Sequence, residues 1–170
     1  LENLYRSSDG GRNWQFLRQY GHSLTFGESG RAIYALGGNM LVRSLDDGQT
    51  WNQSVMPETE PGRQVSGVAA HPVKTDTVFA LYDGTSDTRL PAIFISTDAG
   101  RTWAGTNLLS HICEPRLFFD HGQGQVVYAI GCGNEAWVSV DSGVTWEACG
   151  TPSDWVWVPH SESRLAVDPQ

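Results

Sequence analysis

The octapeptide Ser96-Thr97-Asp98-Ala99-Gly100-Arg101-Thr102-Trp103 decides the fold, because its pattern occurs four times along the chain. The shared form is S-x-D-x-G-x-T-W, with Asn13 in place of the threonine in the first copy. The recurring residues are Ser7, Asp9, Gly11 and Trp14; Ser44, Asp46, Gly48 and Trp51; Ser96, Asp98, Gly100 and Trp103; and Ser139, Asp141, Gly143 and Trp146. Such recurrence predicts a protein built from repeated structural units.

The residue types of this pattern suit a tight turn that leads into a strand. Serine and aspartate side chains bond to nearby backbone groups and hold the turn. Glycine permits the positive φ that such a turn requires, and tryptophan offers a large apolar face to a neighbouring sheet. The alternative is a metal or catalytic site. No copy has the further oxygen ligands or the glutamate of a calcium-binding EF-hand loop, so we favour a structural role.

Three short β-rich runs separate successive copies, which gives four strands per repeat. In the clearest repeat these runs are residues 65–70, 77–82 and 92–95, and a fourth strand begins at Trp103. Similar runs precede and follow this repeat, including residues 23–26 and 116–119. The sequence therefore predicts an all-β protein of four-stranded antiparallel units.

The four-fold motif resembles the Asp-box, or bacterial neuraminidase repeat, of sialidase-like β-propellers. That superfamily includes sialidases, xyloglucan-cleaving glycosidases, sortilin-type sorting receptors and photosystem II assembly factors. The resemblance implies a β-propeller of four-stranded antiparallel blades with Asp-box hairpins on the outer rim, away from a sialidase active site. Because one fold carries several functions, it constrains the architecture more than the activity.

The order of strands at the two ends suggests where the blades begin and end. The first run, at residues 3–6, leads straight into a motif as a third strand does, and residues 164–170 resemble an inner strand. We therefore expect a segment of a larger propeller, whose remaining blades are partners of this chain. The alternative is a four-bladed ring in which residues 155–158 and 165–167 complete the last blade. The expected divisions are a partial blade 1–20, blades 21–57, 64–109 and 114–150, and a partial blade 154–170.

Composition excludes several classes of partner. The 170 residues include 19 acidic and 11 basic side chains, for a net charge of −8, and no basic stripe that would suit nucleic acid. The sequence contains no run of about 18 apolar residues, so we expect no direct membrane insertion. No phosphate-binding loop, dinucleotide fingerprint or zinc-cysteine pattern occurs, so we expect no cofactor. The histidines lack metal-ligand spacing, and a turn role suffices for His71 and His121.

Three cysteines, Cys113, Cys132 and Cys149, lie in or beside one repeat. Antiparallel neighbours would place Cys113 and Cys132 at the same end of a blade, within reach of a disulfide. Reduced thiols are the alternative. With the disulfide formed, Cys149 is the spare residue or pairs with a residue missing from this segment. A disulfide would favour an extracytoplasmic setting, whether secreted, periplasmic or lumenal, which agrees with most proteins of the resembled superfamily.

Propellers usually bind ligands where loops join the second strand to the third and one blade to the next. The candidate ligand face therefore comprises Asp83, Asp87, Arg89, Glu114, Arg116, Asn134, Glu135, Trp155 and Trp157. Arg89-Leu90-Pro91 resembles the Arg-Ile-Pro motif of sialidases but lies too close to Ser96, so we favour a loop arginine paired with Asp87. Trp155 and Trp157 share one face of a predicted strand. One interpretation is that both tryptophans pack between blades, and the alternative is that they form an exposed aromatic shelf for a sugar or a partner peptide. We favour packing between blades.

Two function classes fit these residues. The first is a non-catalytic extracytoplasmic module that binds a protein or glycan or scaffolds an assembly. The alternative is part of a glycoside hydrolase of sialidase or xyloglucanase type, which needs paired acids or, by resemblance, a cluster of arginines. Neither set is evident in these short loops, so we favour the binding module.

Overall fold

The computed structural model describes residues 2–21, 23–27, 31–37, 40–57, 63, 65–83, 89–109, 115–120, 124–131 and 136–149. Within these ranges the regular structure consists of β-strands, arranged as three four-stranded sheets and one two-stranded sheet. The all-β prediction is therefore confirmed. No helix in the described part of the chain is long and apolar enough to cross a bilayer.

Each sheet is a meander in which successive strands pair antiparallel with their chain neighbours. The two-stranded sheet consists of β1 (Glu2–Arg6) and β2 (Gln15–Tyr20). The next sheet consists of β3 (Ser23–Phe26), β4 (Ile33–Gly37), β5 (Met40–Ser44) and β6 (Asn52–Val55). The third consists of β7 (Val65–Ala70), β8 (Val78–Tyr82), β9 (Ile93–Ser96) and β10 (Ala104–Gly105). The fourth consists of β11 (Arg116–Phe119), β12 (Val127–Ile130), β13 (Ala136–Ser139) and β14 (Glu147–Cys149).

The strand predictions agree closely with these bounds, with one systematic difference. The predicted runs at 23–26, 65–70 and 116–119 are β3, β7 and β11 without change. The prediction that each tryptophan begins the fourth strand was wrong by one residue. Trp51, for example, precedes β6 because the antiparallel ladder between β5 and β6 ends at the pair Arg43 and Asn52.

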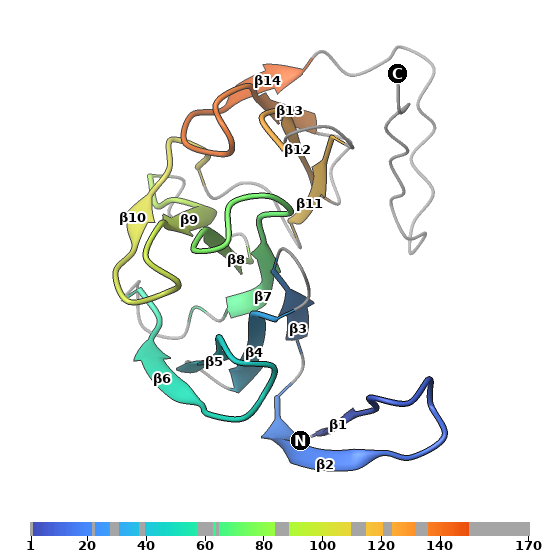
Figure 1. Ribbon diagram of the computed structural model, residues 1–170. Helices are drawn as coiled ribbons and strands as arrows, with labels where there is room; N and C mark the ends of the chain where they lie inside the picture. Colours follow the sequence, from blue (N-terminus) through green and yellow to red (C-terminus); the bar gives the residue numbers. More distant parts are fainter. Residues whose placement is uncertain are drawn as a thin grey trace, which may run out of the picture.

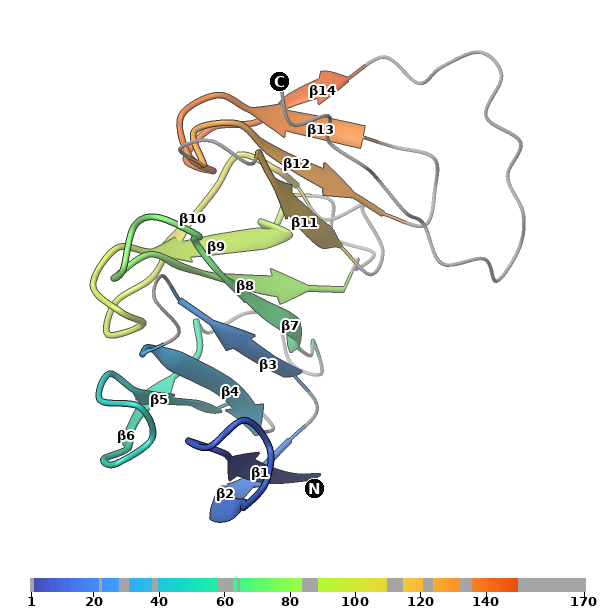
Figure 2. The same ribbon diagram turned by 45° about the vertical axis from the view of Figure 1, so that its right-hand side comes forward.

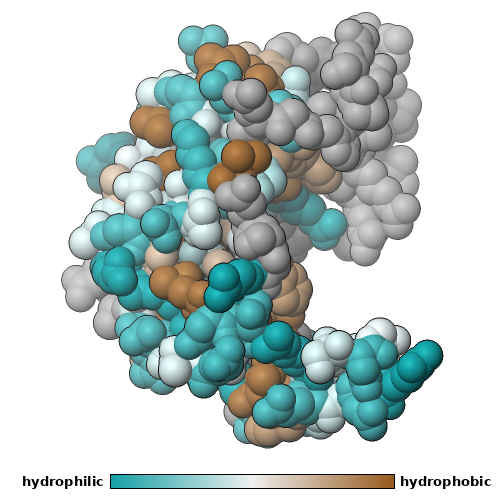
Figure 3. All heavy atoms as spheres, in the orientation of Figure 1, coloured by the Kyte–Doolittle hydropathy of each residue, from teal (hydrophilic) through white to brown (hydrophobic). Residues whose placement is uncertain are grey.

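The sheets follow one another along an arc, as Figure 1 shows, with β3, β7 and β11 on its inner side and β6, β10 and β14 on its outer side. Figure 2 shows the sheets as successive layers, with the β1–β2 ribbon beside the β3–β6 sheet. This is the arrangement of neighbouring blades in a β-propeller. The described surface in Figure 3 is mostly hydrophilic, and its brown patches are small and separate.

Two apolar clusters hold the four-stranded sheets together. The first lies between the β3–β6 and β7–β10 sheets and includes the fully buried Tyr34, Leu41 and Val78. The second lies between the β7–β10 and β11–β14 sheets and includes Phe79 and Trp146. Burial of large side chains between sheets is the main source of stability expected for such a layered fold.

His71 joins the turns of two neighbouring sheets. Its Nδ1 accepts hydrogen bonds from the backbone N–H groups of Val73 (3.1 Å) and Lys74 (3.0 Å), so its Nε2 carries the proton and donates to the Gly124 carbonyl at 2.9 Å. The imidazole also contacts the Phe119 ring edge to face, with 5.5 Å between centroids. The predicted turn role of His71 is confirmed, and His121 lies outside the described residues.

Candidate functional site

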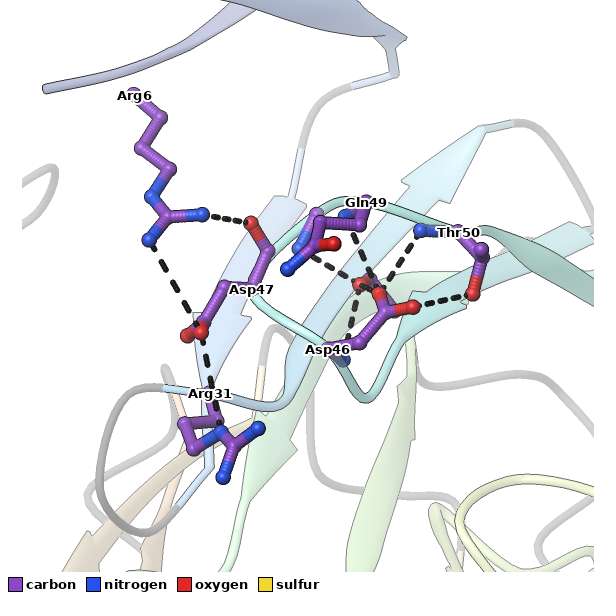
Figure 4. A network of polar contacts seen from close by, with 8 residues as sticks. Arg6, Arg31, Asp46, Asp47, Gln49 and Thr50 are labelled. Atoms are coloured by element: carbon purple, nitrogen blue, oxygen red, sulfur yellow. Dashed lines mark hydrogen bonds and ion pairs between the residues drawn. The ribbon is translucent and has the colours of Figure 1, made fainter. Parts of the chain in front are cut away.

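The four S-x-D-x-G-x-[T/N]-W segments, hereafter the repeat loops, share one set of hydrogen bonds. In the second loop the Ser44 hydroxyl donates to Asp46 Oδ1 (2.8 Å) and accepts from the Gly48 N–H (2.8 Å). Asp46 Oδ1 also accepts from the N–H groups of Gln49 and Thr50, and its Oδ2 accepts from the Thr50 hydroxyl at 2.6 Å (Figure 4). The other three loops repeat this arrangement.

These bonds favour the ionised form of each loop carboxyl. The hydrogen bonds from Thr50 and Ser44 lower the pKa of Asp46 to about 2, and those from Asn13 and Ser7 do the same for Asp9. Burial acts in the opposite direction on Asp141, but hydrogen bonds from Thr145 and Ser139 outweigh it and bring the pKa to about 2. In the structure the carboxylates are thus engaged in holding their own turns.

A second contact of the repeat loops was not predicted from the sequence. Arg6 and Arg43 each precede a loop serine and donate across to the next sheet. Arg6 Nη1 donates to the Asp47 carbonyl at 2.8 Å, and Arg43 Nη1 donates to the Ala99 carbonyl. Figure 4 shows Arg6 and Arg31 on either side of the Asp47 carboxylate, at 3.9 and 3.8 Å. The sequence feature that could have predicted this contact is the arginine directly before the loop serine in two repeats.

Each of the last three loops lies against the sheet that precedes its own. A Cβ atom added at Gly48 would meet Leu17 of β2, one at Gly100 would meet Leu41 of β5, and one at Gly143 would meet Phe79 of β8. All three glycines also have positive φ, between 81° and 87°. Glycine is therefore required here both for the backbone conformation and for the close approach of the neighbouring sheet.

The groove that we take as the candidate site lies on the inner side of the arc, between strands β7 and β11. It has a volume of about 640 Å³. Its lining residues come from the inner strands of all three four-stranded sheets and from the end of β8; they are Ser23, Val65, Ser66, Gly67, Val68, Ala69, Leu81, Asp83, Pro115, Arg116 and Leu117. The groove thus lies where the inner strands of neighbouring sheets meet.

Comparison of the two junctions between inner strands explains why the groove opens at β7 and β11. At the first junction the β3 hydroxyls of Ser23 and Thr25 accept hydrogen bonds from the N–H groups of Val68 and Ala70, both at 3.1 Å. On β7 the equivalent positions hold Gly67 and Ala69. The equivalence follows from the strand pairing, since Gly67 pairs with Leu81 on β8 and Ser23 pairs with Leu36 on β4. Gly67 and Ala69 have no hydroxyl to reach the next strand.

The register of β11 then leaves a main-chain donor at the groove. The pair Leu117 and Ala129 is equivalent to the pair Val68 and Ala80 of the preceding sheet. The Val68 N–H points away from β8, so the Leu117 N–H points away from β12. Leu117 lines the groove opposite β7. An acceptor oxygen of a ligand could take the place that the Ser23 hydroxyl occupies at the first junction.

Two predicted ligand-face residues, Asp83 and Arg116, meet at this groove. Asp83 directly follows β8, and its carbonyl accepts a hydrogen bond from Arg63 Nε at 3.1 Å. Its carboxylate Oδ1 is buried and has no hydrogen-bond partner within the described chain. Arg116 begins β11 and is exposed. Among its described residues, the groove lining therefore includes one carboxylate, Asp83, and one guanidinium, Arg116.

The other predicted residues do not extend this site. Arg89 is exposed and is not part of the groove lining, so its proposed pairing with Asp87 stays a prediction. Cys149 is a free, half-buried thiol at the end of β14, and burial raises its pKa. The remaining candidates lie outside the described residues; they are Asp87, Cys113, Glu114, Cys132, Asn134, Glu135, Trp155 and Trp157. Within the described ranges no three His, Cys, Asp or Glu side chains could together hold a metal ion.

Comparison with known families then identifies the chain. Residues 39–164 match the model of the Sortilin-Vps10 family, described as sortilin, neurotensin receptor 3. The chain belongs to the Sortilin-Vps10 family. This match agrees with the predicted superfamily and covers three of the four repeat loops, those that begin at Ser44, Ser96 and Ser139.

Among curated proteins, the chain is similar to xyloglucanase Xgh74A of Acetivibrio thermocellus. The two are 31% identical over 111 residues, which is 56% of this chain and 13% of the xyloglucanase. The chain thus spans only about one eighth of the length of this relative.

Solved structures show the same fold at lower identity. The GH74 xyloglucanase of Xanthomonas campestris superposes with a TM-score of 0.60 at 20% identity, over 87% of this chain and 21% of the enzyme. YCF48 bound to D1 peptide superposes with a TM-score of 0.53 at 19% identity, over 86% of this chain and 47% of YCF48. These likenesses establish the β-propeller architecture.

Proposed function

We propose that this Sortilin-Vps10 family chain is a non-catalytic binding module that holds an extended polypeptide segment in the groove between β7 and β11. The observation that carries the proposal is the inner edge strand β11, with the Leu117 N–H at the groove and with Asp83 and the exposed Arg116 in its lining. A strand edge supplies main-chain hydrogen bonds to an extended peptide, and side-chain positions beside it supply specificity.

The chemistry of the lining favours a peptide over a glycan. Sugar rings usually stack on aromatic faces, and none of the described lining residues is aromatic. Gly67 has no side chain and Ala69 has only a methyl group, which leaves room for the main chain of a ligand to approach β7. Asp83 and Arg116 suit a segment that carries one basic and one acidic side chain. The structural neighbour YCF48 bound to D1 peptide supports a protein ligand for this fold.

An extracytoplasmic setting is part of the same proposal. It rests on the predicted disulfide between Cys113 and Cys132, and it requires that these thiols be oxidised in the natural protein. Alkylation of the unreduced protein with iodoacetamide, followed by mass spectrometry, should then modify Cys149 alone. Modification of all three cysteines would contradict the disulfide and remove this support.

A glycoside hydrolase is the second candidate, because the curated relative with 31% identity is a xyloglucanase. Asp83 is the one carboxylate among the described residues of the groove lining, whereas glycoside hydrolysis generally needs a pair of carboxyl groups. Incubation with xyloglucan separates the two candidates. Release of new reducing ends that is lost in Asp83→Asn would favour the hydrolase, and unchanged xyloglucan is expected for the binding module.

The binding test uses the full chain and a displayed library of random linear peptides. Peptides selected on the wild-type chain should bind Asp83→Asn and Arg116→Gln about tenfold more weakly, since each change removes one charged contact. Glu147→Gln and Arg12→Gln are matched controls, because both residues are exposed and lie outside the groove. Failure to select any peptide, or equal affinity for all four variants, would overturn the proposal.

A further inference from the structure

Strand β11 carries a second main-chain donor beside the Leu117 N–H. The Asp120 N–H donates to the Val126 carbonyl at 3.0 Å. Because bonded and non-bonded pairs alternate along an antiparallel ladder, Phe118 is hydrogen-bonded to β12, whereas Leu117 and Phe119 are not. The N–H and C=O groups of Leu117 and Phe119 therefore point away from β12, toward the edge of the sheet at which β11 lies.

The first junction between inner strands shows what such a pair of donors binds. There the N–H groups of Val68 and Ala70, also two residues apart on an inner strand, donate to two hydroxyls of β3, both at 3.1 Å. At the second junction Gly67 and Ala69 take the place of those hydroxyl residues and have no side-chain acceptor. The two donors of β11 are therefore available to the acceptors of a bound segment.

The spacing of the two donors fits an extended main chain. Leu117 and Phe119 are two residues apart on one strand, so their N–H groups lie about 7 Å apart. Alternate residues of a second strand repeat at the same spacing and direct their own N–H and C=O groups to one side. A segment that adds to the edge of β11 therefore bonds through two of its residues, and the residue between them directs its N–H away from β11.

One end of the junction is closed, which limits the length of the bonded stretch. His71 directly follows β7, and its Nε2 lies 2.9 Å from the Gly124 carbonyl oxygen, so the turns after β7 and β11 are joined there. The Phe119 ring contacts the same imidazole. Asp83 and Arg116 lie at the opposite end, where β7 and β11 begin. The bonded stretch of a ligand is therefore about as long as the four residues of β11.

We propose that the groove recognises a short extended segment by its main chain, through paired hydrogen bonds to Leu117 and Phe119. The inference rests on the proposed function, since it defines the class of polypeptide that the groove takes. Asp83 and Arg116 select side chains at one end of the segment. Along the bonded stretch, two positions two residues apart require a free N–H, and the position between them does not.

Paired variants of Leu117 test the first donor. Leu117→Pro removes the N–H that points away from β12, a position at which an edge strand accepts proline. Leu117→Ala is the matched control, because it also loses the leucine packing but keeps the donor. A peptide selected on the wild-type chain should bind Leu117→Pro about tenfold more weakly than Leu117→Ala. Circular dichroism checks the fold of both, and equal affinity for two folded variants would overturn the proposal.

An N-methyl scan of the selected peptide tests the spacing of the two bonds. It uses the wild-type chain, so it stands even if Leu117→Pro does not fold. Methylation of one amide at a time should weaken binding at least about tenfold at two positions two residues apart, and less than about threefold at the position between them. A uniform effect along the peptide, or a single sensitive position, would overturn the proposal.

These outcomes differ from a failure of the proposed function. If no peptide is selected, or if Asp83→Asn and Arg116→Gln leave its affinity unchanged, the binding module itself is wrong. If both charge variants weaken binding while the two Leu117 variants bind equally, the groove holds the peptide by its side chains alone. That result would overturn only the main-chain inference.

Discussion

Arg43 in the third strand of one sheet donates a hydrogen bond to the main-chain carbonyl of Ala99 in the repeat loop of the next sheet. The same guanidinium nitrogen, Nη1, donates to the Ser54 hydroxyl at 2.9 Å. Burial lowers the pKa of Arg43, with the nearby Arg101 acting in the same direction. A buried arginine therefore links two blades through Ala99, a non-glycine residue with a positive φ of 60°.

Arg43→Met should reduce the free energy of unfolding by about 1.5–3 kcal/mol, the range for hydrogen bonds to charged groups. Methionine keeps most of the apolar stem and removes the donor. Arg6→Met is the matched control, since Arg6 makes the equivalent bond to Asp47 but its side chain is 40% exposed. Its cost should stay below about 1 kcal/mol. Urea unfolding measures both, and equal losses would contradict a burial-dependent link.

Gly143→Ala should cost about 1–3 kcal/mol more than Gly11→Ala, the range expected for overpacking. The two glycines hold the same loop position with φ of 87° and 88°, so the backbone strain of the substitution is common to both. Only at Gly143 would the new methyl group meet the Phe79 ring. Thermal unfolding compares the variants, and equal destabilisation would show that the loop does not dock closely on β8.

The stability of the fold should decrease as the pH falls through the titration of His71. Burial lowers the pKa of His71 below its ordinary value of 6.5, opposed by the Gly124 hydrogen bond and aided by the charge of Lys74. The unfolded chain then binds the proton first, so the stabilisation is complete above about pH 6.5 and is lost as the pH falls toward the lowered pKa.

His71→Gln provides the comparison for this pH effect. Glutamine keeps a donor for the Gly124 carbonyl but does not titrate. Urea unfolding between about pH 7.5 and pH 5 should show a smaller loss of stability in the variant than in the wild type. Identical pH dependence in the two proteins would mean that the other titrating groups account for the whole effect.

Features encoded within a few residues could be predicted from the sequence. The repeat loops take all their internal hydrogen bonds from an eight-residue stretch, as the bonds of Asp46 to Ser44 and Thr50 show. Strands such as β7 and β11 begin and end at the predicted residues because turn signals border them closely. Local propensity and spacing suffice for such elements.

Features that depend on which strands become neighbours could not be predicted. The groove opens because Gly67 and Ala69 face β11 and have no hydroxyl. At the equivalent positions of β3, by contrast, the hydroxyls of Ser23 and Thr25 bond to the main chain of β7. Asp83 and Arg116 were predicted to share a face, but their common groove depends on that junction. The exposure of Trp14 beside the burial of Trp146 likewise reflects packing between sheets rather than the shared motif.

The central claim is that a ligand binds in the groove between β7 and β11, and the double variant Gly67→Ser/Ala69→Thr tests it most directly. The variant gives β7 the hydroxyls that β3 uses, which should engage the β11 edge and narrow the groove. A Cβ at Gly67 would make only ordinary contacts, at 3.6 Å to Ser23 and 3.7 Å to Leu81, so the chain should still fold. Isothermal titration with a peptide selected on the wild type should then show binding lost. Undiminished affinity in a folded double variant would contradict the account.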